Sequence, residues 1–106
     1  PGISFMPIAP FGEPNGWLTT LLIDPVEFGS SCEEVRQRLE ADNIEARRVW
    51  KPMHQQPVFA GCRAIGGAVS EQIFEQGLSL PSGSAMTDDD LQRVIDAVLA
   101  VSPASR

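Results

Sequence analysis

Aliphatic residues near the C-terminus of the chain repeat with the period of an α-helix. Five of them follow one another at intervals of three or four residues: Leu91, Val94, Ile95, Val98 and Leu99. This spacing places them on one face of a helix that packs on a core. Thr87 can cap the helix, and the aspartates 88–90 complement the positive end of its dipole. We predict a helix from Thr87 to Ser102-Pro103, and the aspartates need no metal to explain them.

Two shorter helices are predicted in the middle of the chain. Ser31 and Glu34 fit a capping box, in which each side chain accepts a hydrogen bond from the other residue's backbone N–H. The apolar face of this helix would hold Cys32, Val35 and Leu39. Asn43 follows it and can adopt the left-handed conformation that ends helices. The second helix covers residues 68–76, and Gly77 stands where a C-terminal glycine cap is expected.

Four segments have the character of β-strands. Residues 17–23 are aromatic, β-branched and uncharged, which predicts a strand covered on both faces. Residues 3–8 are apolar, but Pro7 limits them to an edge strand or an extended arm. Residues 46–50 and 78–80 are the other two candidates. Strands and helices in this order predict one α+β domain over residues 1–106, with a small sheet and about three helices on one side of it.

Composition and charge exclude several classes of protein. The chain has a net charge of −6 and a single lysine, whereas a nucleic-acid-binding domain would carry a basic stripe. No apolar run approaches the ~20 residues of a membrane span. Cys32 and Cys62 are too few for a disulfide scaffold, and free thiols in a reducing cytoplasm are the simpler interpretation, although one bridge between them stays open. We therefore expect a cytoplasmic protein that binds neither nucleic acid nor membranes.

Familiar catalytic motifs do not account for the polar residues. The chain has no Gly-x-Ser-x-Gly elbow, and nothing in the spacing of Cys62 and His54 indicates a catalytic dyad. His54, Cys32 and Cys62 are too scattered to predict a zinc site. Residues 61–67 are rich in glycine but lack the spacing and the lysine of a phosphate-binding loop. We predict no catalytic residue, bound cofactor or metal ligand in this chain.

One loop gathers unusual residues. Trp50, the sole lysine Lys51 and the sole histidine His54 stand within five positions, and Gln55-Gln56 follow. A flat apolar ring, a cation and neutral amides together suit a polar ligand with a flat or sugar-like body and a negative charge. The residues alone equally allow a proline-rich surface loop with Trp50 packed on the core. The second loop, residues 81–84, offers backbone N–H and hydroxyl groups and has the same two interpretations.

These residues resemble a known family. The similarity lies in four stretches that follow one another in order along nearly the whole chain: residues 15–19 (Asn-Gly-Trp-Leu-Thr), 50–59 (beginning Trp-Lys-Pro-Met-His), 74–84 (ending Leu-Pro-Ser-Gly-Ser) and 87–91 (Thr-Asp-Asp-Asp-Leu). They are similar to the C-terminal part of DegT-type nucleotide-sugar aminotransferases. The similarity is greatest to the branch that aminates UDP-linked 4-keto-6-deoxy sugars.

The resemblance implies a pyridoxal 5'-phosphate-dependent enzyme of fold-type I, usually a homodimer, with glutamate as the amino donor. It also implies that the chain is a small C-terminal domain with a mostly antiparallel sheet, and that most of the enzyme lies outside it. The large domain of the family carries the lysine that binds the cofactor, and Lys51 does not match that position. We expect this domain alone to be inactive and to hold no cofactor.

The family implies that this domain covers the cleft on the nucleotide-sugar side. The candidate contact residues are Asn15, Trp17, Trp50, Lys51, His54, Ser82 and Ser84. The charge of Lys51 suggests that it lies near a diphosphate. Two other classes stay open. A stand-alone α+β module would cover its own core, whereas an interaction domain, like a domain taken out of an enzyme, would leave an apolar face bare.

Overall fold

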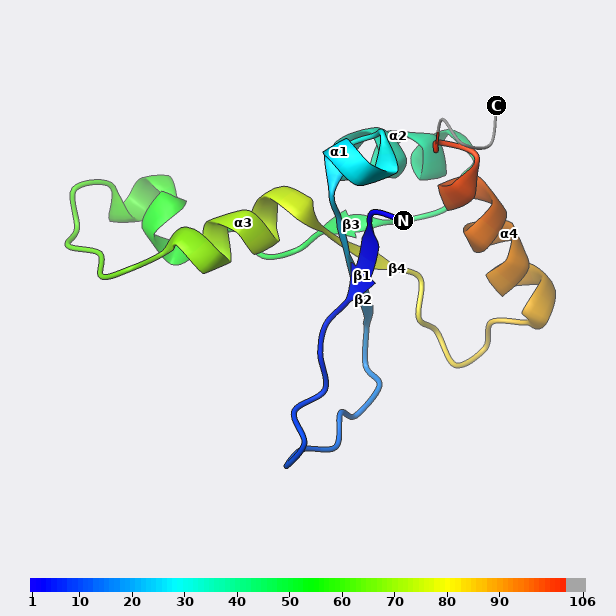
Figure 1. The fold of residues 1–106 in the computed structure, drawn as a ribbon, viewed down its shortest axis with the longest axis horizontal. Coiled ribbons are helices and arrows are strands. Elements are labelled where there is room, and N and C mark those ends of the chain that lie inside the picture. The colour runs from blue at the N-terminus through cyan, green and yellow to red at the C-terminus, as the bar shows by residue number, and fades with distance from the viewer. Residues whose placement is uncertain (103–106) are drawn as a thin grey trace.

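The computed structural model describes residues 1–102 as an antiparallel sheet with helices (Figure 1). In chain order its elements are β1 (Ile3–Phe5), β2 (Thr19–Ile23), α1 (Pro25–Phe28), α2 (Cys32–Ala41), β3 (Arg47–Arg48), the short 3-10 helices η1 (Met53–Gln55) and η2 (Pro57–Phe59), α3 (Ala68–Gln76), β4 (Gly77–Leu80) and α4 (Asp88–Leu99). The strand order is β1-β2-β4-β3, and each neighbouring pair is antiparallel. The predicted α+β class is confirmed.

The core lies between the central strands and two of the helices. Leu21 of β2 stands opposite Leu78 of β4, and Ile23 lies further along β2. These side chains share one buried cluster with Val35 and Leu39 of α2 and with Val94, Ala97 and Val98 of α4. Helix α3 contributes no fully buried side chain. The sheet and the helices α2 and α4 therefore supply most of the apolar burial that holds the domain together.

Strand β2 differs from its prediction. Leu21 and Ile23 are buried, but Thr20 before them and Leu22 between them are only partly covered. The prediction that both faces are buried is therefore wrong, because the helices of the core cover one face of this strand. Trp17 and Leu18 lie outside the strand and are exposed. Strand β1 ends at Phe5, before Pro7, which cannot donate to a ladder.

The capping residues that the sequence indicates begin the helices. The hydroxyl of Ser31 accepts from Glu34 N–H, and the Glu34 carboxylate accepts from Ser31 N–H at 2.7 Å. Thr87 and Asp90 form the same capping box at the start of α4. Asn43 has φ +56°, as expected for a left-handed residue after a helix. Helix α4 ends at Leu99, earlier than predicted, and Pro103 lies outside the described residues.

Gly77 is not the left-handed cap that we predicted. Its φ is −85°, and it passes directly from the last turn of α3 into β4. A Cβ at this position would lie 2.5 Å from the carbonyl oxygen of Ile73 and 2.5 Å from Cγ2 of Val49. Glycine is therefore required here by the close approach of the β3 side of the sheet rather than by its backbone angles.

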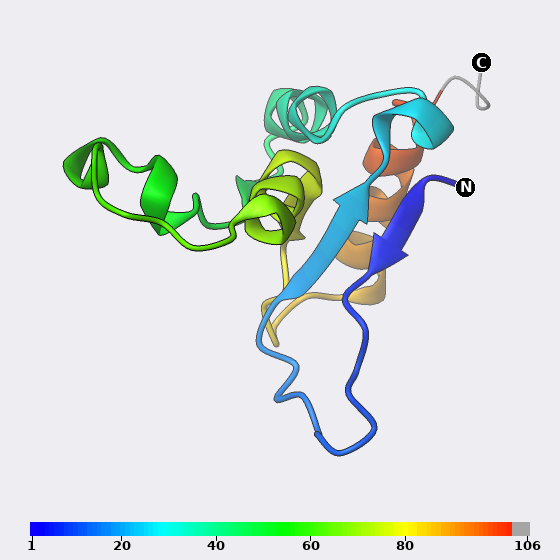
Figure 2. The same ribbon diagram turned by 60° about the vertical axis from the view of Figure 1, so that its left-hand side comes forward.

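Two segments project from the core (Figures 1 and 2). Residues 6–18 form a long hairpin-like loop, and residues 53–76, with η1, η2 and α3, form an arm. The radius of gyration is 15.4 Å, whereas a compact domain of this length has a value of about 13 Å. The short helices α1, η1 and η2 were not predicted. Within residues 1–102, no helix has both the length and the hydropathy needed to cross a bilayer.

Candidate functional site

A groove between the base of the hairpin-like loop, β3 and the end of β4 brings several candidate residues together. We call it the tryptophan groove; it measures about 670 Å³. Its walls are formed by Trp17, Leu18, Glu45, Arg47, Arg48, Trp50, Ser79, Leu80, Pro81, Ser82, Gly83 and Met86. The lining combines flat aromatic rings, two guanidinium groups and two hydroxyls. Such a set suits a flat ring that carries an anionic group.

The two tryptophans of the chain both line this groove, and their rings lie close together. Their ring centroids are 6.2 Å apart, and the ring planes are inclined by 41°. Trp17 is 66% exposed and Trp50 is 69% exposed. Packing on the core therefore does not explain either ring, so the interpretation of Trp50 as a core residue fails. Two apolar rings that stay open to solvent are the surfaces on which a flat ligand can stack.

Polar contacts hold the backbone around these rings. The side-chain oxygen of Asn15 accepts a hydrogen bond from Trp17 N–H at 3.2 Å and turns the chain just before the ring. The hydroxyl of Ser82 accepts from Thr19 N–H at 2.7 Å and donates to the carbonyl of Leu80 at 3.0 Å. Asn15 and Ser82 thus support the groove through the backbone.

The other candidates lie apart from the rings. Lys51 is exposed, directly after Trp50, but does not line the groove. Ser84 is exposed in the loop beyond Ser82. His54 lies in the arm, where its Nε2 is 2.6 Å from Oε1 of Glu71 on α3. It lines a separate cavity of about 280 Å³. The structure thus brings together Trp17, Trp50 and Ser82, and it places His54 elsewhere.

Sequence reasoning missed the charged residues of β3. Arg47 is exposed and forms an ion pair with Glu45 at 2.5 Å, whereas Arg48 is largely covered. The pairing of β3 with β4 sets Arg47 opposite Ser79 and Arg48 opposite Leu78. Both arginines line the groove, and the sequence alone could not place them there because it does not show which strand pairs with β3. The one signal in the sequence was a pair of arginines that interrupts the apolar alternation of a predicted strand.

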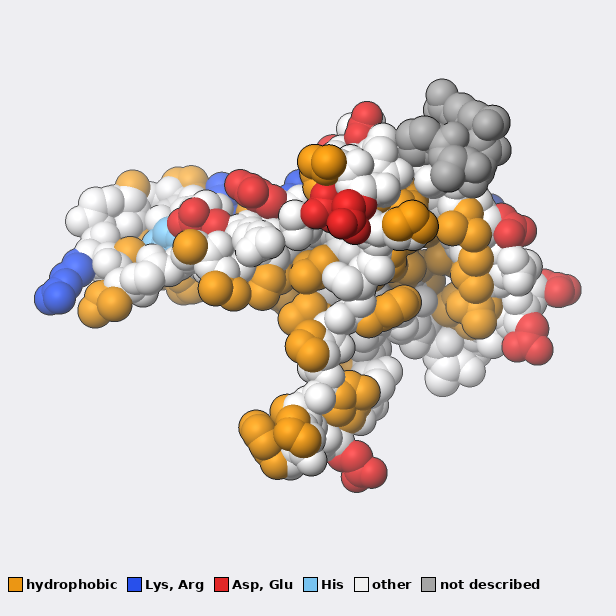
Figure 3. Space-filling model, in the orientation of Figure 1, with side chains coloured by type: hydrophobic (Ala, Val, Ile, Leu, Met, Phe, Trp, Pro, Cys, Tyr) orange, Lys and Arg blue, Asp and Glu red, His pale blue; other side chains and the backbone are white. Residues whose placement is uncertain are grey.

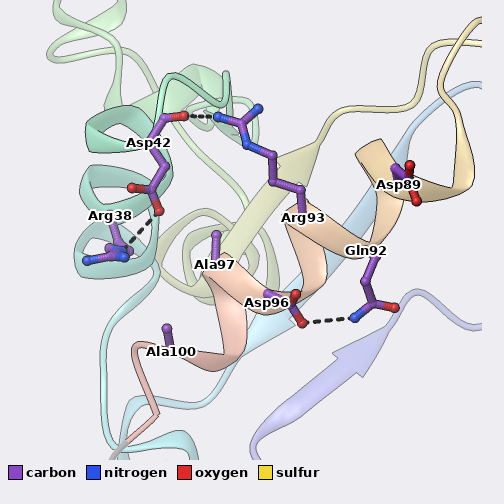
Figure 4. Close-up of a pocket in the computed structure, with 8 residues that line it drawn as sticks. All are labelled: Arg38, Asp42, Asp89, Gln92, Arg93, Asp96, Ala97 and Ala100. Atoms are coloured by element: carbon purple, nitrogen blue, oxygen red, sulfur yellow. Dashed lines mark hydrogen bonds and ion pairs between the residues drawn. The ribbon is translucent and has the colours of Figure 1, made fainter.

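A second surface hollow, about 480 Å³, lies between α2 and α4 (Figure 4). Its charged side chains engage one another. Arg38 pairs with Asp42 at 3.1 Å, and Arg93 donates to the carbonyl oxygen of Asp42. Gln92 donates to Asp96 at 2.8 Å. The Arg93 contact joins α4 to the end of α2, and the other two contacts lie within one helix each, so we interpret this hollow as structural. Among residues 1–102, no three His, Cys, Asp or Glu side chains lie together as a metal site would require.

Comparisons with known proteins agree with the fold. The chain is 45% identical over 102 residues to EpsN of Bacillus subtilis (strain 168), a protein assigned to the pyridoxal phosphate-dependent aminotransferases, and 92% of the chain is covered. It is 35% identical over 82 residues to the GDP-perosamine synthase of Caulobacter vibrioides, with 77% of the chain covered.

Among solved structures, the aminotransferase-like fold is matched by DesI, crystallised in the presence of its TDP-sugar product. The TM-score is 0.84 at 27% identity, and the match covers 94% of the chain. The chain spans 26% of the length of EpsN, 22% of GDP-perosamine synthase and 26% of DesI. The DegT/DnrJ/EryC1/StrS aminotransferase family matches residues 3–99. The chain belongs to this family, and its fold matches one part of a longer aminotransferase-like chain.

Proposed function

We propose that the chain is the C-terminal, substrate-covering domain of a pyridoxal 5'-phosphate-dependent aminotransferase. The complete enzyme would transfer an amino group from glutamate to a nucleotide-linked 4-keto-6-deoxy sugar, as a homodimer in the cytoplasm. The observation that carries the proposal is the family match over residues 3–99 in a chain that spans about a quarter of its relatives. The tryptophan groove, which is formed by residues of this chain, is the proposed binding site for the nucleotide sugar.

The groove has the chemistry that a nucleotide sugar needs. The open faces of Trp17 and Trp50 can stack on the base or on the sugar ring. Arg47 of β3 lies at the wall, paired with Glu45, and the exposed cation of Lys51 stands just outside the groove. The names of two similar proteins, GDP-perosamine synthase and DesI with a TDP-sugar product, point to nucleotide-linked sugars as the substrate class.

The residues of this chain do not fit a site for the cofactor. Pyridoxal 5'-phosphate supplies an electron sink for amino transfer and is attached through a lysine. Lys51 is the sole lysine of the chain and is exposed on the loop after β3. It takes no part in the ion pairs formed among residues 1–102. We propose that the rest of the complete enzyme holds the cofactor.

Substitutions in the complete polypeptide test the function and the groove together. Trp50→Ala should raise the KM for the UDP-linked keto sugar about tenfold, since a stacked ring is worth ~1–3 kcal/mol. The rate of the glutamate half-reaction should not change. Lys51→Ala should raise the same KM more than it slows that half-reaction. Phe11→Ala is the matched control, because Phe11 is a 92% exposed aromatic residue that lies on the hairpin-like loop and outside the groove.

Two results would contradict the proposal in different ways. A complete polypeptide that forms no amino sugar from any nucleotide-linked keto sugar with glutamate would overturn the proposed function. Equal effects of Trp50→Ala and Lys51→Ala on both half-reactions would leave the family assignment intact and remove the groove as the nucleotide-sugar site.

A further inference from the structure

Arg48 reaches from strand β3 to the end of helix α3. Its guanidinium lies 4.7 Å from the centroid of the Phe74 ring, a cation–π contact. The Nη2 group donates to the carbonyl oxygen of Phe74 and, at 3.3 Å, to that of Glu75. Nη1 is 3.9 Å from the Glu33 carboxylate on α2. This one side chain of β3 therefore contacts both α2 and α3.

Helix α3 needs this contact because its last carbonyl groups have no donors within the helix. Its last turn carries no basic residue that could interact with the negative end of the helix dipole. Cys32 of α2 donates its S–H to the carbonyl oxygen of Glu75 at 2.9 Å, and Arg48 supplies the other donor. The C-terminal end of α3 is thus capped by side chains of two other elements.

The same contact sets the position of Trp50. Arg48 precedes Trp50 by two residues, and Val49 N–H between them donates to the carbonyl of Gly77 at 3.3 Å. The absent side chain of Gly77 lets Val49 approach the end of α3. The backbone that leads into Trp50 is therefore fastened to the junction of α3 and β4 at Arg48 and at Val49. If that junction moves, the Trp50 ring moves with it.

We propose that Arg48 is a positioning residue, which fastens the end of α3 to β3 and thereby places Trp50 in the tryptophan groove. Its Nη2 donates to two carbonyls, whereas the buried Nε has no hydrogen-bond partner among the described residues. Arg48 thus acts on a ligand through Trp50. The exposed Arg47, which is paired with Glu45, is the more accessible of the two arginines that line the groove. The inference rests on the proposed function only for the identity of the ligand.

The test compares Arg48→Met with Arg93→Met in the complete polypeptide. Arg93 is the matched control because it also donates to a carbonyl at a helix end, that of Asp42, and lies outside the groove. Arg48→Met should weaken the binding of UDP about tenfold through the misplaced Trp50 ring. It should raise the KM for the nucleotide sugar and leave the glutamate half-reaction unchanged. Arg48→Lys should recover part of the affinity, since an ammonium group can still donate to the carbonyls.

Amide hydrogen exchange gives a second measurement that needs no ligand. Exchange over residues 47–52 and 73–78 should become faster in Arg48→Met and stay unchanged there in Arg93→Met. Unchanged exchange in these segments would overturn the inference, as would UDP affinity equal to that of Arg93→Met. If the parent enzyme binds no UDP but exchange in these segments still becomes faster in Arg48→Met, Arg48 keeps its proposed positioning role and UDP is not the ligand of the groove. A melting temperature recorded for each variant shows whether it has folded.

Discussion

At the scale of residues, neighbours in the sequence are not neighbours at the site. Trp50 and His54 stand four positions apart, but Pro52 and the 3-10 turn η1 direct the chain into the arm. There the His54 ring contacts Glu71, and it fits because Gly67 has no side chain. A Cβ on Gly67 would lie 2.8 Å from Cε1 of His54. The clustering that drew attention to this loop therefore combines a groove residue with a residue that ties η1 to α3 within the arm.

The two thiols, both free as the simpler interpretation expected, should differ sharply in reactivity. Cys62 is exposed, whereas Cys32 is buried and donates to the carbonyl of Glu75. Burial raises the pKa of the Cys32 thiol, so less thiolate is present at any given pH. At about pH 8 a disulfide reagent should modify one thiol of the native chain quickly and the other only on unfolding.

Single serine variants show which cysteine reacts in the fast phase and which reacts only on unfolding. Cys62→Ser should remove the fast phase, and Cys32→Ser should leave it. Two fast phases of equal amplitude in the native chain would show that α2 does not shield Cys32.

At the scale of elements, the helices could be predicted more closely than the strands. Helix starts depend on local hydrogen bonds, so Ser31 with Glu34 and Thr87 with Asp90 indicate them directly. Strand ends depend on partners far along the chain. Strand β3 is only two residues long because it pairs with two residues of β4. The groove depends on the same pairings, so the sequence indicated its rings and could not indicate Arg47 and Arg48 at its wall.

The two capping boxes predict how the stability of the chain depends on pH. The backbone N–H and the hydroxyl of Ser31 lower the pKa of Glu34, and those of Thr87 lower the pKa of Asp90. A carboxyl group with a lowered pKa in the folded state stabilises the fold fully above its unfolded pKa, about 4 for such groups. That stabilisation is lost as the pH falls through the lower, folded pKa. The chain should therefore lose thermal stability on acidification through this range.

Thr87→Ala tests the cap at α4. It should cost about 1 kcal/mol at neutral pH, which lowers the melting temperature by about 4–8 °C in a domain of this size. Because the Asp90 carboxylate then loses a hydrogen-bond donor, the stability that is lost when Asp90 is protonated at low pH should be smaller. Ser84→Ala, an exposed change outside the cap, is the control. Circular dichroism melts at several pH values measure both effects; equal acid sensitivity in Thr87→Ala and the parent would contradict the explanation.

At the scale of the whole molecule, much apolar surface remains open to solvent. The hairpin-like loop, the arm and α4 all carry exposed apolar side chains (Figure 3). Between β1 and α4 an apolar groove of about 250 Å³ remains open. Leu91, Ile95 and Leu99, which belong to the predicted apolar stripe of α4, are 40–51% exposed. A stripe that extends beyond its own core favours a domain that is covered by another part of a protein.

This surface should be measurable in the isolated 106-residue chain. It should bind a hydrophobic dye in the folded state and elute earlier from a sizing column than a compact protein of 11.5 kDa. Ile95→Gln with Leu99→Gln should reduce both effects and change the melting temperature little, since both side chains are about half exposed. Val26→Gln is the control, because Val26 is 90% exposed on α1 and outside that groove. A chain that binds no dye and elutes as a compact monomer would instead favour the stand-alone module, because such a chain would have no apolar face left to cover.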